Sequence, residues 1–169
     1  MKGTRKTPLQ VAICLLAALL FCAFDQPSVH VQPVDPSSPR EPEDQTQQAV
    51  VRDYLLAWQT LGNALDQNRP ELLDTAFVGV AKEKLAATIA EQQKLGLQTR
   101  YTDRSHDLKL VFYSPEGLSI QLIDNVEYDV VVTDHDKLQS TRHVKTRYIA
   151  VLSPTEVRWK VRVFQATTQ

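Results

Sequence analysis

The sequence predicts an α+β protein in which three N-terminal helices pack on a curved four-stranded antiparallel sheet, preceded by one transmembrane or signal segment. Two patterns carry this prediction. Apolar residues recur every three or four positions between residues 46 and 95, and every second position from residue 97 onward. At 169 residues, the chain has room for one domain with a conventional hydrophobic core.

Residues 1–24 are predicted to be a signal anchor or a signal peptide, because basic residues precede an apolar run at residues 9–24. The run is slightly shorter than the ~20 residues of a spanning helix. No small-x-small cleavage site follows it, which favours an uncleaved anchor over a cleaved peptide. We therefore expect a membrane-anchored protein with its domain on the extracytoplasmic side, periplasmic or exported, and a secreted protein if the segment is cleaved.

Residues 25–45 are predicted to be a proline-rich linker between this segment and a domain at residues 46–169. Its five prolines disfavour helices and strand ladders, so we expect an extended tether with polyproline character. His30 is expected to be a solvated linker residue.

Composition excludes several functional classes. Cys14 and Cys22 both lie in the N-terminal apolar run, so the domain has no cysteine nucleophile and no cysteine-ligated zinc. The formal net charge of −1 becomes −4 without the three basic residues of the first 24, so no nucleic-acid partner is expected. The basic row of Arg158, Lys160 and Arg162 is interpreted as a solvated face.

The helical half divides at a proline and a glycine. One amphipathic helix of about twenty residues is expected to start near Asp44 or Thr46 and to end before Pro70. A short helix is expected at residues 70–76 and a third at residues 80–95, which Gly96 terminates. The aromatic residues of the first helix, Tyr54 and Trp58, are interpreted as core.

Four strands are predicted at residues 98–113, 118–133, 139–152 and 157–165, and the first is bulged near residues 103–107. Matching the apolar faces of neighbouring strands predicts the pairing between them. The predicted inner-face pairs are Leu108 with Asp124, Asp124 with Ala150, and Ala150 with Trp159. The predicted outer-face pairs are Asp129 with Lys145 and Glu127 with Arg147, which makes these four residues structural.

The order of elements and several short sequences carry a resemblance over residues 49–165. These sequences are YLLAWQ in the first helix, QKLG after the third, TRY at residues 146–148 and RWKVRVF at residues 158–164. The chain resembles the NTF2-like superfamily of α+β cone rolls and, more weakly, the C-terminal domain of plastid and cyanobacterial division proteins. The superfamily contains isomerases and dehydratases as well as protein-binding modules, so the resemblance implies a fold and not one function.

Asp124 is the one carboxylate on the apolar face of its strand. The resemblance implies a cone enclosed by the helices and the concave face of the sheet. In enzymes with an NTF2-like fold, this cone holds an acidic base together with a tyrosine or histidine. The predicted pairing places His106 diagonal to Asp124, with Tyr128 and Tyr148 nearby and the small Ala150 leaving room. These four polar residues are the catalytic candidates, although no enzyme motif is matched residue by residue.

A structural role for Asp124 is the stronger interpretation. The carboxylate would then be rotated outward by a bulge with Asn125, cap a helix, or pair with Arg100 or Arg104.

The Asp134-His135-Asp136 triplet is interpreted as hairpin chemistry rather than a metal site, because no further ligand stands at a recognisable spacing. We expect no cofactor and no metal. The favoured function is a membrane-tethered module that binds a protein partner or forms a homodimer through its sheet. The alternative is an isomerase- or dehydratase-type enzyme that binds a small molecule.

Overall fold

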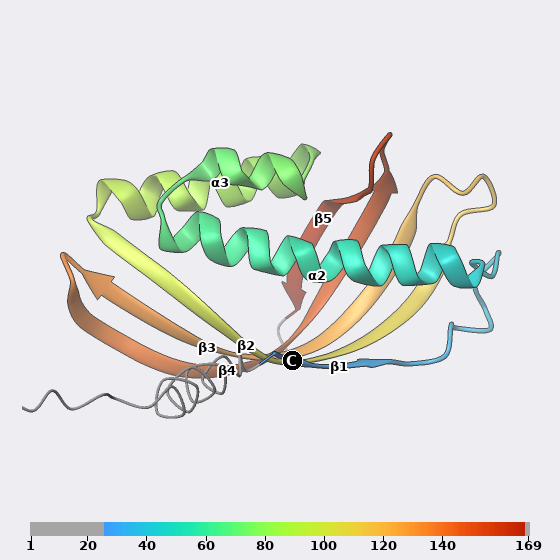
Figure 1. The fold of residues 1–169 in the computed structure, drawn as a ribbon, viewed down its shortest axis with the longest axis horizontal. Coiled ribbons are helices and arrows are strands. Elements are labelled where there is room, and N and C mark those ends of the chain that lie inside the picture. Colours follow the sequence, from blue (N-terminus) through green and yellow to red (C-terminus); the bar gives the residue numbers. More distant parts are fainter. Residues whose placement is uncertain (1–25, 168–169) are drawn as a thin grey trace, which may run out of the picture.

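The computed structural model describes residues 26–167, and its sheet has five strands in the order β1-β2-β3-β4-β5. Both long helices lie on the same side of this strongly curved sheet (Figure 1). The elements are β1 (Ser28–Val31), α2 (Asp44–Asp66), the 3-10 helix η2 (Pro70–Thr75), α3 (Gly79–Lys94), β2 (Leu97–Tyr113), β3 (Ile120–Asp134), β4 (Lys137–Pro154) and β5 (Trp159–Thr167).

The three predicted helices are confirmed, with boundaries set by local chemistry. Asn68 adopts a left-handed conformation (φ 52°) after α2, and Pro70 then starts η2 at a position that needs no N–H. Gly96 (φ 68°) ends α3, as its freedom at positive φ predicts. The helices therefore cover one face of the sheet in the predicted order.

The hairpin between β2 and β3 largely follows the prediction. Leu108 pairs with Asp124, and the expected bulge lies between Asp103 and Ser105. A second irregularity between Leu110 and Phe112 turns Phe112 outward, where 38% of it is exposed.

The predicted pairing between β3 and β4 is wrong by two residues. Asp124 lies opposite Tyr148 and not Ala150, which instead pairs with Leu122. The cause is the turn: His135 (φ 46°) and Asp136 (φ 65°) form a tight two-residue connection, whereas a longer loop was assumed.

The charged pairs on the outer face shift with this register. Glu127 lies opposite Lys145, whose Nζ is 2.7 Å from its carboxylate, and Asp129 lies opposite His143 at 2.8 Å. Arg104 also binds Asp129. The outer acids are paired, but with different partners from those predicted.

The predicted register of the last hairpin is also wrong. Phe164, and not Trp159, lies opposite Ala150. Thr155 and Arg158 close a wider loop through a backbone hydrogen bond of 2.9 Å, so β5 begins at Trp159 and Val157 stays in the loop, 79% exposed. This change brings Phe164 under the helices.

The expectation that residues 25–45 form no ladder is wrong. Residues of β1 pair in parallel with Ser105 to Leu108 of β2, and the backbone of Gln32 and Asp35 continues to bond to this strand. His30 binds the Asp107 carboxylate at 2.7 Å instead of being free in a linker. The prolines lie before and after the short strand, so they do not interrupt its hydrogen bonds.

The predicted anchor or signal segment lies outside the described residues. Within residues 26–167, no helix is both long and apolar enough to cross a membrane.

Candidate functional site

The cone is the space between the helices and the concave face of the sheet. There β2, β3 and α2 bring together three polar side chains, those of His106, Asp124 and Tyr54. The Tyr54 hydroxyl of α2 donates to Asp124 Oδ2 at 3.0 Å, and Nδ1 of His106 lies 2.8 Å from the same oxygen. Asp124 is 0% exposed and His106 is 1% exposed. The structure thus joins two of the predicted residues, and adds a third from a helix 70 residues away.

Two polar atoms of this cluster have no hydrogen bond among the described residues. They are Oδ1 of Asp124 and Nε2 of His106. The second atom faces Asp103, whose Oδ2 lies 3.8 Å away. Buried polar atoms are usually satisfied, so unused hydrogen-bonding capacity is a reason to consider function here.

The electrostatics of the cluster favour a protonated imidazole. Burial lowers the pKa of His106, but the neighbouring carboxylates of Asp103 and Asp124 outweigh this effect and raise the pKa to about 9. Burial and the Asp124 charge raise the pKa of the Tyr54 hydroxyl well above its usual value. Near neutral pH, His106 Nδ1 therefore donates to the carboxylate, and Tyr54 is a neutral donor.

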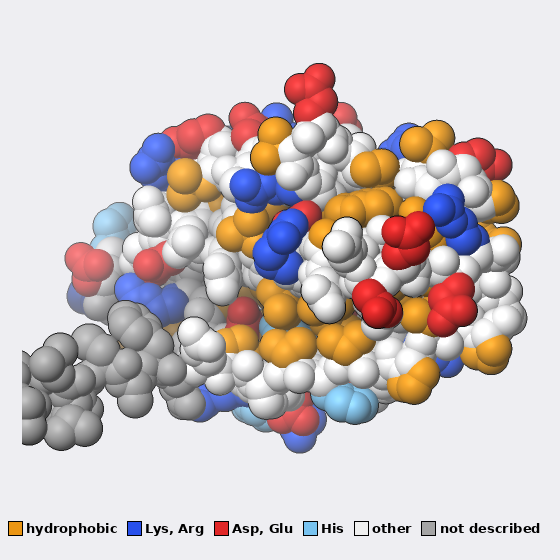
Figure 2. Space-filling view, turned by 45° about the vertical axis from the view of Figure 1, so that its right-hand side comes forward, with side chains coloured by type: hydrophobic (Ala, Val, Ile, Leu, Met, Phe, Trp, Pro, Cys, Tyr) orange, Lys and Arg blue, Asp and Glu red, His pale blue; other side chains and the backbone are white. Residues whose placement is uncertain are grey.

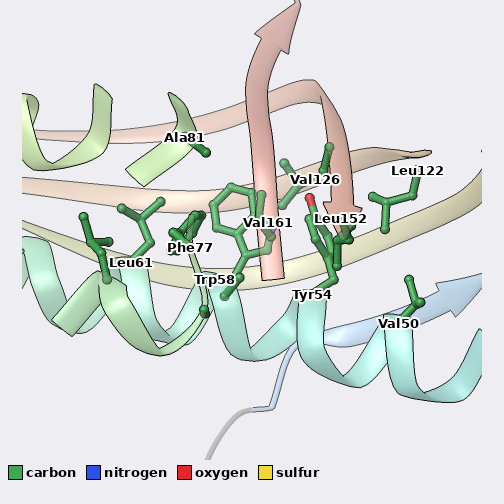
Figure 3. Close-up of a cluster of buried hydrophobic side chains, with 14 of the residues drawn as sticks. Val50, Tyr54, Trp58, Leu61, Phe77, Ala81, Leu122, Val126, Leu152 and Val161 are labelled. Atoms are coloured by element: carbon green, nitrogen blue, oxygen red, sulfur yellow. The ribbon is translucent and has the colours of Figure 1, made fainter. Parts of the chain in front are cut away.

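Trp58 fills the space in front of these groups. It is 2% exposed, and its ring centre lies 5.5 Å from that of His106 and 5.3 Å from that of Phe164. Figure 3 shows Tyr54 and Trp58 projecting from α2 toward the strands that carry Val126 and Leu152. The cone is occupied by side chains at the position of the candidate site.

The two predicted tyrosines lie nearby but do not bind the carboxylate. Tyr148 is opposite Asp124 in the sheet, yet its ring stacks on Phe164 with 4.5 Å between the centres. Burial first, and then the Tyr128 hydroxyl, raise the pKa of Tyr148. Because Tyr148 occupies the place expected for Ala150, the predicted free space beside Asp124 is absent from the described fold.

The predicted structural partners of Asp124 are not those found. Arg100 binds Asp66, and Arg104 binds Asp129. The β3–β4 pairing runs without a shift past Asp124, so no bulge rotates the carboxylate outward.

Tyr54 was missed as a partner of Asp124. Its helical spacing correctly indicated burial, but nothing in the sequence showed which strand its hydroxyl would meet.

Two of the cavities outside the polar cluster adjoin α2. One of about 210 Å³ is enclosed by α2, α3 and the sheet, and includes Tyr101 and Tyr148 but neither Asp124 nor His106. The other is an open groove of about 970 Å³ along the outer side of α2, which we call the α2 groove. Figure 2 shows hydrophobic side chains exposed on one face of the molecule, with charged and other polar groups between them.

The triplet at the β3–β4 turn is part of the tight hairpin. The His135 ring binds the neighbouring Asp134 carboxylate, and Asp136 occupies the second left-handed position. Across residues 26–167, no three His, Cys, Asp or Glu side chains are grouped to hold a metal ion.

Comparison with known proteins gives structural matches only. No family model matches the sequence, and no curated protein does. The intermembrane space region of the chloroplast protein ARC6 is similar with a TM-score of 0.64 and 16% identity, over 77% of this chain and 100% of that one.

Two bacterial proteins, both from Novosphingobium aromaticivorans, are similar at a TM-score of 0.51. A putative scytalone dehydratase is 13% identical over 75% of this chain and 89% of its own, and a putative aromatic ring hydroxylase is 11% identical over 75% and 96%. At these identities the similarity extends to the fold alone. The described domain has an NTF2-like fold, with similarity to the ARC6 region, as the sequence predicted.

Proposed function

We propose that this protein is a membrane-tethered, extracytoplasmic NTF2-like domain that acts as a protein-binding or dimerisation module. The observation that supports this function best is the filled cone. Trp58 covers His106, and neither His106 nor Asp124 offers more than 1% of its surface to solvent. A substrate would need open space in front of these groups.

The outer face of the sheet is the proposed contact surface. Both helices pack on the opposite side (Figure 1). Ile123 pairs with Ile149 across β3 and β4, and Val151 pairs with Val163 across β4 and β5, with all four side chains partly exposed. Beside them runs the ladder of paired charges that includes Glu127 and Lys145. An apolar centre with a charged margin is typical of protein interfaces.

The test is association of the full chain in phospholipid nanodiscs or mild detergent, followed by light scattering and crosslinking. We expect Ile149→Arg to weaken self-association or partner crosslinking at least tenfold, because it places a charge in the apolar centre. Thr141→Arg, at the exposed far end of the same strand, is the matched control and should leave association unchanged. A strict monomer without any crosslinked partner would contradict the proposal.

The location is tested separately by protease protection and carbonate extraction of membranes. An uncleaved anchor predicts that the chain stays in the membrane pellet and that the domain is cut only by protease on the extracytoplasmic side. Recovery of a shortened chain in the soluble exported fraction would indicate a cleaved signal peptide.

A small-molecule enzyme of the isomerase or dehydratase type is the second candidate. It is favoured by Nε2 of His106 and Oδ1 of Asp124, which have no hydrogen bond among residues 26–167 and lie in one cluster with a tyrosine donor. Substrate access would require Trp58 to move. The test is NMR of the His106 ring during titration with cyclic enones: a saturable shift supports the enzyme, and an unchanged signal supports the protein-binding module.

A further inference from the structure

The α2 groove is lined mainly by apolar side chains on its floor. Val51 and Leu55 stand one helical turn apart on α2, Leu56 lies beside them, and Val31 of β1 and Val157 of the β4–β5 loop form the sides. Val31 is 36% exposed and Val157 is 79% exposed. Val51, Leu55 and Leu56 are only partly buried, whereas Tyr54 and Trp58 on the other side of α2 belong to the core.

The groove is long. Its α2 residues extend from Asp44 to Gln59, which corresponds to about 22 Å at about 1.5 Å per residue. A small molecule on so open a surface would leave much of itself in water, whereas binding sites for small molecules bury most of the ligand. Four turns of a second helix match this length.

The lining also favours a helix over an extended peptide. An extended peptide needs main-chain partners along its length, but the main chain of α2 is already hydrogen-bonded within the helix, and the edge strand β1 has only 4 residues. The polar residues of the lining include Gln47, Gln48 and Gln59. A bound helix satisfies its own backbone and needs only side-chain contacts.

The charges along the groove are uneven. Arg52 binds Asp53 at 3.0 Å, and Asp53 also accepts the Trp159 N–H at 2.8 Å, so this pair is satisfied and holds β5 against α2. Arg158 as a whole residue is partly buried, and its guanidinium has no acceptor among residues 26–167. Arg158 lies beside Asp53, within this stretch of α2, because the neighbouring Trp159 N–H binds Asp53. Asp44, at the N-terminal end of α2, has no cationic partner within the same residues.

From this pattern we infer that the α2 groove binds an amphipathic helix of another protein, with a carboxylate placed against Arg158. The apolar floor takes leucine-type side chains at positions i, i+4 and i+7 of the partner. A carboxylate against the partly buried arginine forms a charge-assisted pair, while a lysine at that point is repelled. The N-terminal end of the groove, near Asp44, favours a basic residue.

The test measures fluorescence anisotropy of two labelled sixteen-residue helical peptides with the full chain in nanodiscs. Both peptides carry the same leucine stripe, and one has two glutamates where the other has two lysines at the positions that meet Arg158. We expect the glutamate peptide to bind at least tenfold more tightly. Arg158→Glu should reverse this order, and Leu55→Asp should abolish binding of both peptides.

Two controls separate this inference from folding and from the proposed sheet interface. Thermal melting checks that Leu55→Asp is folded. Ile149→Arg, which reports on the sheet, should leave peptide binding unchanged. Absence of binding, equal affinity of both peptides, or indifference to Arg158→Glu would overturn the inference. A dimer of the full chain that Leu55→Asp dissociates would also overturn it, because the groove would then bind a second copy of this chain.

Discussion

Helix α2 has two apolar sides with opposite surroundings. On the inner side, Tyr54 and Trp58 are 0% and 2% exposed and fill the cone above the sheet. On the outer side, Val51 and Leu55 line an open groove of about 970 Å³. The inner side of α2, which faces the cone, is packed with aromatic rings. The accessible apolar surface of α2 is on its outer side.

This difference separates stability from binding. Large aromatic residues inside a closed core contribute to folding but cannot meet a ligand. Partly exposed aliphatic residues contribute less to folding and remain free to meet a partner. Substitutions on the inner side should therefore change the free energy of unfolding, and those on the outer side should change association.

The largest expected effect is that of Trp58→Ala. Removing this buried ring leaves a void among four aromatic neighbours, and we expect a loss of about 3–5 kcal/mol in the free energy of unfolding. Leu55→Ala, on the outer side of the same helix, should cost about 1 kcal/mol or less. Urea unfolding measures the free energy of both variants. Equal losses would contradict the distinction between the inner and outer sides of α2.

The next effect is the pH dependence of stability. The pKa of His106 is raised from 6.5 to about 9 in the folded state, so its contribution is complete below pH 6.5 and is lost as the pH rises through 9. At about 1.4 kcal/mol per pKa unit, the loss is about 3 kcal/mol. Urea unfolding of wild type and His106→Gln across this range should give converging stabilities. Parallel pH profiles would show that His106 is not held as an imidazolium.

Tyr54→Phe should have an intermediate effect. It removes the hydroxyl that donates to Asp124 Oδ2 while keeping the ring, and a hydrogen bond to a charged group contributes about 1.5–3 kcal/mol. Tyr148→Phe is the matched control, because its hydroxyl makes no hydrogen bond to Asp124 in the described structure. Calorimetry compares the two variants. A larger loss for the control would place the main polar contact elsewhere.

The smallest effect is expected for the outer ladder. Lys145→Met removes the partner of Glu127, but both side chains are solvated, so the urea midpoint should not change measurably. A clear destabilisation would mean that the outer acids also contribute to the fold.

The sequence predicted the elements better than their pairing. Helical periodicity located α2 and the buried positions of Tyr54 and Trp58, because a 3.6-residue repeat depends only on local geometry. The pairing of β3 with β4 depended on the turn, where His135 and Asp136 adopt left-handed conformations that are uncommon outside glycine. A two-residue error there moved Tyr148 into the place expected for Ala150.

The candidate site was predicted only in part, because its local contacts follow from the sequence pattern and its long-range contacts do not. The contact of His106 with Asp124 followed from the β2–β3 hairpin, a local pairing with Gly117 at positive φ in its turn. The Tyr54 contact joins a helix to a distant strand, which strand periodicity does not specify. Strand β1 was missed because prolines surround its four residues and its partner lies about 77 positions later in the chain.

The central claim is that the cone is closed over Asp124, and the accessibility of Trp58 tests it most directly. The chain has two tryptophans, so Trp159→Phe leaves Trp58 as the sole indole emitter. The account predicts blue-shifted emission from this variant and acrylamide quenching several-fold weaker than in the urea-unfolded chain. Quenching as strong as in the unfolded chain would show that solvent enters the cone, and would contradict the account.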